Sequence, residues 1–241
     1  MKYFFDTEFL EGKQDKTLFG LKYGETKPTI DLISIGIVAE DGREYYAISK
    51  DFNIDEAWNR HCNSGWIREN VLRPIHEELY LKAITDKKYT KEHFGRIGYN
   101  LKDFKTLVNY YGLSNKEIAC QINHFINPEI LTPDLSKSVG LKNDVSPVFY
   151  AYYADYDWVV FCQLFGTMMD LPIFFPMYCK DLKQISDEAE IELYGEYKHL
   201  GENRPTLKQN VDYPKQHNEH NALDDARWNV ELYKFLNSQK Q

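Results

Sequence analysis

Three strand-like segments open the chain without a helix between them. They are residues 2–9, 29–40 and 43–50, with the sequences KYFFDTEF, TIDLISIGIVAE and REYYAISK. An Asp-Gly turn at residues 41–42 links the last two as a hairpin. Further on, the apolar strand 146–154 leads into a helical run that closes at Gly166. Antiparallel strands followed by alternating strands and helices predict an α/β fold, in which a mixed sheet is flanked by helices.

Helical patterns occupy four other stretches. They cover residues 54–61, 64–75, 114–126 and 220–236. Pro74 is expected to end the second helix, and Ser114 and Glu117 have the spacing of a capping box at the start of the third. The polar stretches 11–28 and 195–218 are expected to be loops.

The chain is long enough for one domain with a substantial core. It has 241 residues, of which 43% are hydrophobic, and we expect a single domain over residues 1–241. The formal net charge of −8 gives no overall basic field, so nucleic-acid binding would need a local basic patch or metal ions. Four cysteines without a C-x-x-C pair indicate neither a zinc site nor a disulfide framework. Because no signal peptide or membrane-spanning run is recognised, we expect a cytoplasmic protein that binds no membrane.

The first strand carries two acidic residues on one face. Side chains at positions i and i+2 of a strand point to the same side, so Asp6 and Glu8 lie together. Two close carboxylates resist joint ionisation unless positive charge lies between them, and Mg²⁺ or Mn²⁺ would supply it. The alternative is a solvated strand end where both acids are simply hydrated.

A second acidic pair stands where the strand 146–154 meets its helix. Asp155 and Asp157 lie at this junction, and the ends of strands are where α/β proteins gather ligands. Aspartate is also a favoured helix N-cap. One aspartate can therefore cap the helix while the other faces a site.

The start of the last helix supplies a third group. Asn221 and Asp224 have N-cap and N3 spacing, which leaves Asp225 and His220 without a structural role. A stripe of small residues that includes Ala222 would let the helix press against the sheet and bring Asp225 near the strand carboxylates. His220 is expected just outside the helix on flexible backbone, where it either reaches the same point or is an ordinary surface residue.

Together these stretches suggest a phosphodiester-hydrolysing site. The four candidate metal ligands are Asp6, Glu8, Asp157 and Asp225. Their combined charge of about −4 would be neutralised by two divalent cations, and two such ions ~4 Å apart are a known device for this hydrolysis. His220 fits the general base that takes the proton from the attacking water.

Three motifs in the sequence resemble those of the DEDDh 3′-5′ exonucleases. They are DTE in the first strand, YD at Asp157, and HNALDD, which fits H-x-A-x-x-D and ends at Asp225. The family contains oligoribonuclease, RNase T and the proofreading subunit of bacterial DNA polymerase III. The motif spacing selects Asp225 over Asp224, and the preceding aromatic favours Asp157 over Asp155. Longer stretches in residues 2–50, 64–75, 148–169 and 219–228 are similar to mycobacterial polyadenylate-specific members of the family.

The resemblance implies both a fold and an activity. The fold would be RNase H-like, with a mixed five-stranded sheet flanked by helices, and residues 76–145 would form an inserted, largely helical segment. The activity would be release of nucleoside 5′-monophosphates from the 3′ ends of single-stranded RNA, with two Mg²⁺ ions per site and Mn²⁺ as a substitute. The mycobacterial members imply a preference for adenosine-rich ends, and family members are commonly homodimers.

Other interpretations stay open at this stage. Phe9 follows Glu8 and is a candidate for stacking a substrate base, whereas Tyr156 and Trp158 are expected to pack in the core. A DNA exonuclease would carry the same motifs. A catalytically silent nucleic-acid-binding module, or a scaffold whose segment 76–145 binds a partner, would keep the fold without needing every motif residue.

Overall fold

The computed structural model describes residues 1–19, 21–60, 65–86, 98–128, 146–195 and 205–239. The chain divides into two compact units. Unit 1 comprises Met1–Asp6, Gly36–Tyr46 and Ile122–Gln241, and unit 2 comprises Thr7–Ile35 and Ala47–Gln121. The strands β1, β4 and β5 supply residues to both units. The single domain over residues 1–241 stays a prediction.

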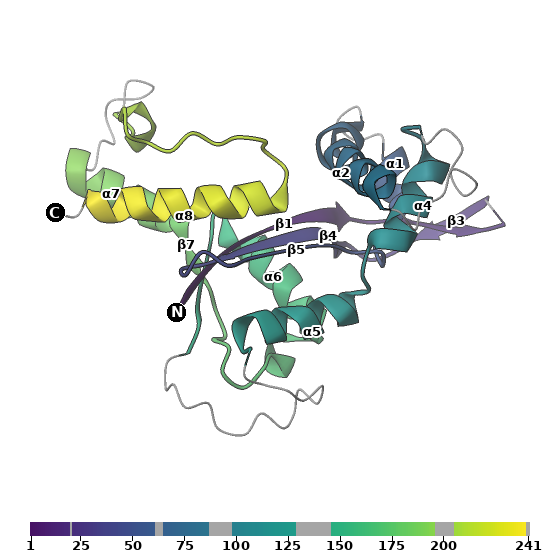
Figure 1. Ribbon diagram of the computed structural model, residues 1–241, viewed down its shortest axis with the longest axis horizontal. Helices are drawn as coiled ribbons and strands as arrows, with labels where there is room; N and C mark the ends of the chain where they lie inside the picture. Colours follow the sequence, from purple (N-terminus) through teal and green to yellow (C-terminus); the bar gives the residue numbers. More distant parts are fainter. Residues whose placement is uncertain (20, 61–64, 87–97, 129–145, 196–204, 240–241) are drawn as a thin grey trace. The chain divides into compact units, whose positions relative to one another are not determined.

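A five-stranded sheet has the order β5-β4-β1-β6-β7 (Figure 1). Its strands are β1 (Lys2–Gly12), β4 (Thr29–Ala39), β5 (Glu44–Ile48), β6 (Val148–Ala151) and β7 (Lys180–Asp181). β1 pairs with β6 in parallel and β6 pairs with β7 in parallel, whereas β4 and β5 are joined by the tight turn predicted at Asp41–Gly42. The predicted mixed sheet with flanking helices is confirmed.

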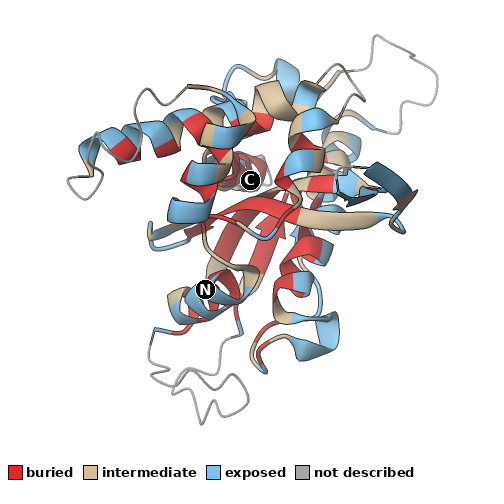
Figure 2. Cartoon of the chain, turned by 90° about the vertical axis from the view of Figure 1, so that its right-hand side faces the viewer, coloured by how far each residue is buried: buried red, intermediate tan, exposed pale blue. Residues whose placement is uncertain are grey.

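Helices cover both faces of the sheet in unit 1 (Figure 1). α7 (Leu182–Tyr194) and α8 (Ala222–Ser238) lie on one face, and α6 (Ala154–Phe165) lies on the other. Phe4 packs with the α7 and α8 side of the core, where Leu182 and Leu232 are fully buried. Phe5 points the other way and packs against Phe161 of α6, with ring centroids 5.5 Å apart. The buried central strands of Figure 2 follow from this two-sided cover.

A glycine allows α8 to approach the sheet closely. A Cβ atom on Gly36 of β4 would lie 2.3 Å from the carbonyl oxygen of Ala222, the first residue of α8. Ala222 and Ala226 are themselves fully buried, as the small-residue stripe predicts. Further along α8, the buried Asn229 donates from Nδ2 to the carbonyl oxygen of Phe5 at 3.0 Å. The helix is therefore fixed to the sheet by backbone contact and by a buried hydrogen bond.

Unit 2 holds a hairpin and a helical layer. The hairpin consists of β2 (Asp15–Leu18) and β3 (Leu21–Glu25), which pair antiparallel. The helices are α1 (Ile54–Asn59), α2 (Arg73–Thr85), α4 (Leu101–Tyr111) and α5 (Asn115–Ile126), the last of which continues into unit 1, with a π-helical segment at Arg68–Leu72. His76 of α2 is buried beside Tyr99 and Phe104, and its Nε2 lies 3.1 Å from the carbonyl oxygen of Gly98.

Two local predictions are wrong. Most of the described residues in 11–28 are not a loop, because β1 continues to Gly12 and the hairpin of β2 and β3 follows. Strand pairing between backbone groups needs no buried apolar side chains. Pro74 does not end a helix but stands in the first turn of α2, where its missing N–H leaves no hydrogen bond unmade.

The segment 76–145 is helical where it is described. It contains the rest of α2, all of α4 and α5. The sequence pattern predicted α5 but not α4. Ser114 and Glu117 form the predicted capping box, with Ser114 N donating to Glu117 Oε2 at 2.7 Å. Residues 87–97 and 129–145 lie outside the described residues, and the status of the segment as an insertion stays a prediction.

Candidate metal and catalytic site

The strand β1 positions the first pair of carboxylates. Successive side chains of a strand alternate, so Asp6 shares the face of Phe4, which is the face that α8 covers. Glu8 comes two residues later on the same continuous strand. Asp6 and Glu8 are both partly buried, and the intervening Thr7 is buried.

The first turn of α8 has the predicted cap. Asn221 Oδ1 accepts from the backbone N–H groups of Leu223 at 3.1 Å and Asp224 at 3.2 Å. The Asp224 carboxylate bonds outward, to Asn218 Nδ2 and to Arg227 Nη1, both at 2.6 Å. Asp224 thus makes its hydrogen bonds at the surface of the helix. Asp225 is the acidic residue of this turn that points inward.

Asp225 is a buried carboxylate, only 5% exposed. Its Oδ1 accepts from Gln216 Nε2 at 2.5 Å and its Oδ2 accepts from the backbone N–H of His220 at 2.9 Å. Burial raises the pKa of Asp225 above its usual value, and the two hydrogen bonds from Gln216 and His220 only partly oppose this. Within the described chain no lysine or arginine forms an ion pair with it. A buried carboxylate in this state fits a cation ligand, because bound positive charge would stabilise its ionised form.

Two hydrogen bonds hold the loop before α8. Asn218 and His220 both have positive φ, at 53° and 70°, and Asn221 N donates to Asn218 O at 3.2 Å. The His220 N–H donates to Asp225 Oδ2, which ties this backbone to the first turn of α8. Left-handed backbone at two non-glycine residues costs free energy, of the order of 1 kcal/mol or more each. The strained backbone places the His220 N–H where it can donate to Asp225.

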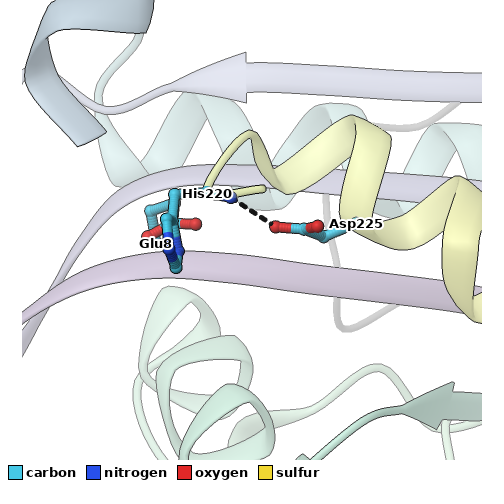
Figure 3. A group of neighbouring side chains, drawn as sticks. All are labelled: Glu8, His220 and Asp225. Atoms are coloured by element: carbon cyan, nitrogen blue, oxygen red, sulfur yellow. Dashed lines mark hydrogen bonds between the residues drawn. The ribbon is translucent and has the colours of Figure 1, made fainter. Parts of the chain in front are cut away.

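One carboxylate of the first strand belongs to the same group of side chains. One ligand atom each from Glu8, His220 and Asp225 lie within 4.8 Å of one another (Figure 3). Two carboxylates and an imidazole at this spacing can hold a divalent cation. Among the described residues neither Asp6 nor Asp157 joins a comparable group of three, so their roles as metal ligands stay predictions.

Asp157 occupies the first turn of α6 and is 5% exposed. Neither it nor Asp155 caps the helix, contrary to that expectation. The N-cap is Tyr153, whose backbone N–H donates to Asp181 Oδ1 at 3.1 Å. The helix starts before both aspartates because a carboxylate from β7 satisfies this N–H, which leaves Asp155 exposed and Asp157 buried.

The aromatic residues next to these acids in sequence differ in burial. Trp158 packs in the core as predicted, stacked on Phe161 with ring centroids 5.1 Å apart. Tyr156 is exposed on α6, so the expectation of core packing is wrong for that residue. Phe9 is partly buried, and its role in stacking a base stays a prediction.

Two residues that shape the site were missed. Gln216 orients Asp225 from a stretch without periodicity, and no sequence signal marks it. Gly36 interrupts an apolar strand, and a glycine inside a strand often marks close approach of another backbone. That signal was present in the sequence.

No family model matches the chain. Two proteins of Mycobacterium tuberculosis, from different strains and each named a 3′-5′ exoribonuclease, are 27% identical to it over 241 residues, or 99% of this chain and 94% of each relative. The chain is similar to 3′-5′ exoribonucleases over its whole length. This similarity supports a place for the chain in a 3′-5′ exoribonuclease family and supports hydrolytic nuclease activity. No helix in the described ranges is long and apolar enough to cross a membrane.

Proposed function

We propose that the protein is a metal-dependent 3′-5′ exoribonuclease of the DEDDh group, with an RNase H-like fold, related to the polyadenylate-specific exoribonuclease RNase AS. It releases nucleoside 5′-monophosphates from the 3′ ends of single-stranded RNA. The observation that carries the proposal is the link between His220 and Asp225, the two ends of the H-x-A-x-x-D motif, at the start of α8. The similarity to named exoribonucleases along the entire chain supports it.

The carboxylates are the proposed ligands of two Mg²⁺ ions, with Mn²⁺ as a substitute. Asp225 is held in one orientation by a hydrogen bond on each oxygen, so it needs no rearrangement to present its remaining lone pairs. Asp6, Glu8 and Asp157 complete the proposed set. When bound, the cations would supply positive charge at the attacking water and at the leaving 3′ oxygen.

His220 is the proposed general base. Its ring takes the proton from the attacking water, a role that imidazole commonly fills. The His220–Asp225 hydrogen bond uses the backbone N–H of His220 and not its ring. The same bond holds the backbone of His220 beside the Asp225 carboxylate, which supports this proposal.

The substrate assignment rests on the relatives and on the motif resemblance. We propose RNA 3′ ends, with a preference for adenosine, and a homodimer as the assembly. A DNA 3′-5′ exonuclease and a catalytically silent binding module are the competing functions, and no contact among the described residues favours either of them.

The test uses 5′-labelled oligo(A), oligo(U), mixed RNA and mixed DNA with Mg²⁺, with EDTA, and with the Asp225→Asn protein. A ladder that shortens from the 3′ end on RNA, stops in EDTA and is absent for Asp225→Asn supports the proposal. The ratio of rates on oligo(A) and oligo(U) measures the base preference. Faster shortening of DNA would favour the DNA exonuclease, and no shortening under Mg²⁺ or Mn²⁺ would refute the enzyme.

A further inference from the structure

The β2–β3 hairpin of unit 2 exposes large apolar side chains. Phe19, in the turn, is 97% exposed and Tyr23 is 69% exposed, and Leu18 and Leu21 beside the turn are exposed as well. Exposed apolar groups gathered on one short element commonly mark a binding surface. The hairpin is therefore a candidate for recognition rather than for packing within unit 2.

The two faces of the hairpin differ in charge. Lys22 Nζ lies 2.6 Å from Asp15 Oδ1 and 3.0 Å from Glu25 Oε1, and Lys13 Nζ lies 3.7 Å from Glu25 Oε2. Two lysines thus balance the charge of the two acidic side chains. The pairing shifts register between Lys16 and Thr17, and the extra residue is Tyr23 of β3. Side chains therefore still alternate along β2, so Lys16 and Leu18 point to the face opposite Asp15. That second face combines a cation with apolar surface.

The hairpin together with the residues that flank it has a charge opposite to that of the chain. Residues 13–27 carry four lysines and two acidic residues, a net charge of +2, whereas the whole chain carries −8. Lys16 and Lys27 form no ion pair in the part of the chain that the structure describes. A locally basic, aromatic element is the local patch that an acidic protein needs to hold a polyanion.

The hairpin is held firmly at its base. The buried Gln14 accepts at its carbonyl oxygen from Thr26 N–H at 2.9 Å, and its own N–H donates to Thr26 Oγ1 at 3.0 Å. Gln14 Nε2 donates to Thr29 Oγ1 at 2.9 Å, and Arg60 donates to the carbonyl oxygens of Glu11 and Lys13. An anchored base with an exposed tip presents the aromatic rings at little entropic cost on binding.

We propose that this hairpin binds single-stranded RNA, with Phe19 and Tyr23 stacking on bases and Lys16 and Lys27 contacting phosphates. Stacking on aromatic rings accepts any base, and lysines bind the backbone without reading sequence. The hairpin thus contributes affinity for the strand and not base preference. The inference rests on the proposed function in that it takes RNA as the substrate.

The experiment measures equilibrium binding of a labelled mixed-sequence RNA 12-mer in EDTA, where hydrolysis is stopped. Phe19→Ser/Tyr23→Ser is expected to weaken binding about fivefold or more, and Lys16→Gln/Lys27→Gln to reduce the slope of log affinity against log salt by about 1.4. Tyr178→Ser and Lys234→Gln are matched controls, because both side chains are exposed in unit 1, and they are expected to leave affinity unchanged. All variants alter exposed side chains, and thermal melts verify the fold.

Affinity within twofold of the wild type for both double variants would overturn the inference, as would an equal loss for the controls. A wild-type dimer that dissociates in the Phe19→Ser/Tyr23→Ser protein, with RNA affinity unchanged, would instead assign the hairpin to protein contact. The two proposals fail separately. RNA binding that depends on the hairpin without any nuclease activity would refute only the proposed function, and intact nuclease activity with hairpin-independent binding would refute only this inference.

Discussion

Replacing Gly36 by alanine tests whether contact between β4 and α8 sets the position of the site. The added methyl would lie 2.3 Å from Ala222 O and 2.4 Å from Leu223 Cα, and both are backbone atoms that cannot rotate away. Ordinary contact begins at about 3.4 Å, so the start of α8 must move by roughly 1 Å. His220 and Asp225 flank this contact on both sides in sequence.

The expected loss has two parts. Overpacking of this kind costs about 1–3 kcal/mol of unfolding free energy, which lowers the Tm of a chain this long by roughly 2–12 °C. A displacement of about 1 Å at a catalytic group can reduce kcat about 10²-fold, or ~2.7 kcal/mol of activation free energy. Thermal melts and initial rates on 5′-labelled RNA with Mg²⁺ measure the two parts on the same preparation.

The control is Gly24→Ala in β3, where a Cβ would meet nothing within 4 Å. It makes the same chemical change and is expected to leave Tm unchanged. Gly36→Ala with both the Tm and the kcat of the wild type would refute the reasoning, because α8 could not then lie against the strand as described. A lower Tm with unchanged kcat would show that the helix contact stabilises the fold without positioning the site.

Three further predictions address the metal ligand, a buried amide and a buried histidine. Asp225→Asn keeps the size of the side chain but removes its charge, so the rate of hydrolysis should fall at least ~10³-fold. The far-UV circular dichroism should stay unchanged. Retained activity would exclude Asp225 as a metal ligand. Asn229→Ala should lower the unfolding free energy by about 1–3 kcal/mol in urea titrations, because Phe5 O loses its buried donor, and a loss below 0.5 kcal/mol would contradict this. Burial lowers the pKa of His76 below its usual 6.5, so the unfolded state binds that proton more readily than the folded state. The contribution of His76 to stability should therefore be fully present above about pH 6.5 and be lost as the pH drops through that value, by at most ~1.4 kcal/mol per pH unit. His76→Gln should remove this pH dependence, which urea titrations at pH 7.5, 6.5 and 5.5 would measure.

Local signals in the sequence were sufficient for much of the sheet and for the start of α8. The cap at Asn221 needs only its neighbours, and the burial of Asp225 follows from the small residues beside it. The core position of Trp158 likewise follows from its apolar surroundings. These features depend on residues within about one helical turn, which is the range that sequence patterns report.

Features that depend on distant partners were not predicted. The start of α6 is set by Asp181, which lies 28 residues from Tyr153, and the hairpin after β1 is held by backbone pairing between mostly exposed residues. The orientation of Asp225 depends on Gln216 in an irregular stretch. No periodicity encodes such contacts, so a pattern of hydrophobic residues could not reveal them. The participation of Asp6 and Asp157 in metal binding remains a prediction of the sequence.

The hydrogen bond between the backbone of His220 and the carboxylate of Asp225 closes a short ring of chain. A ring of this kind tolerates substitution of the residues that lie between His220 and Asp225, provided that the residue facing β4 stays small. It does not tolerate a change of length, because one residue more or fewer would rotate the carboxylate about 100° around the helix axis and open the ring. Variants selected for activity from a mutagenised library should therefore differ in composition between these two residues, and never in the number of residues that separates them.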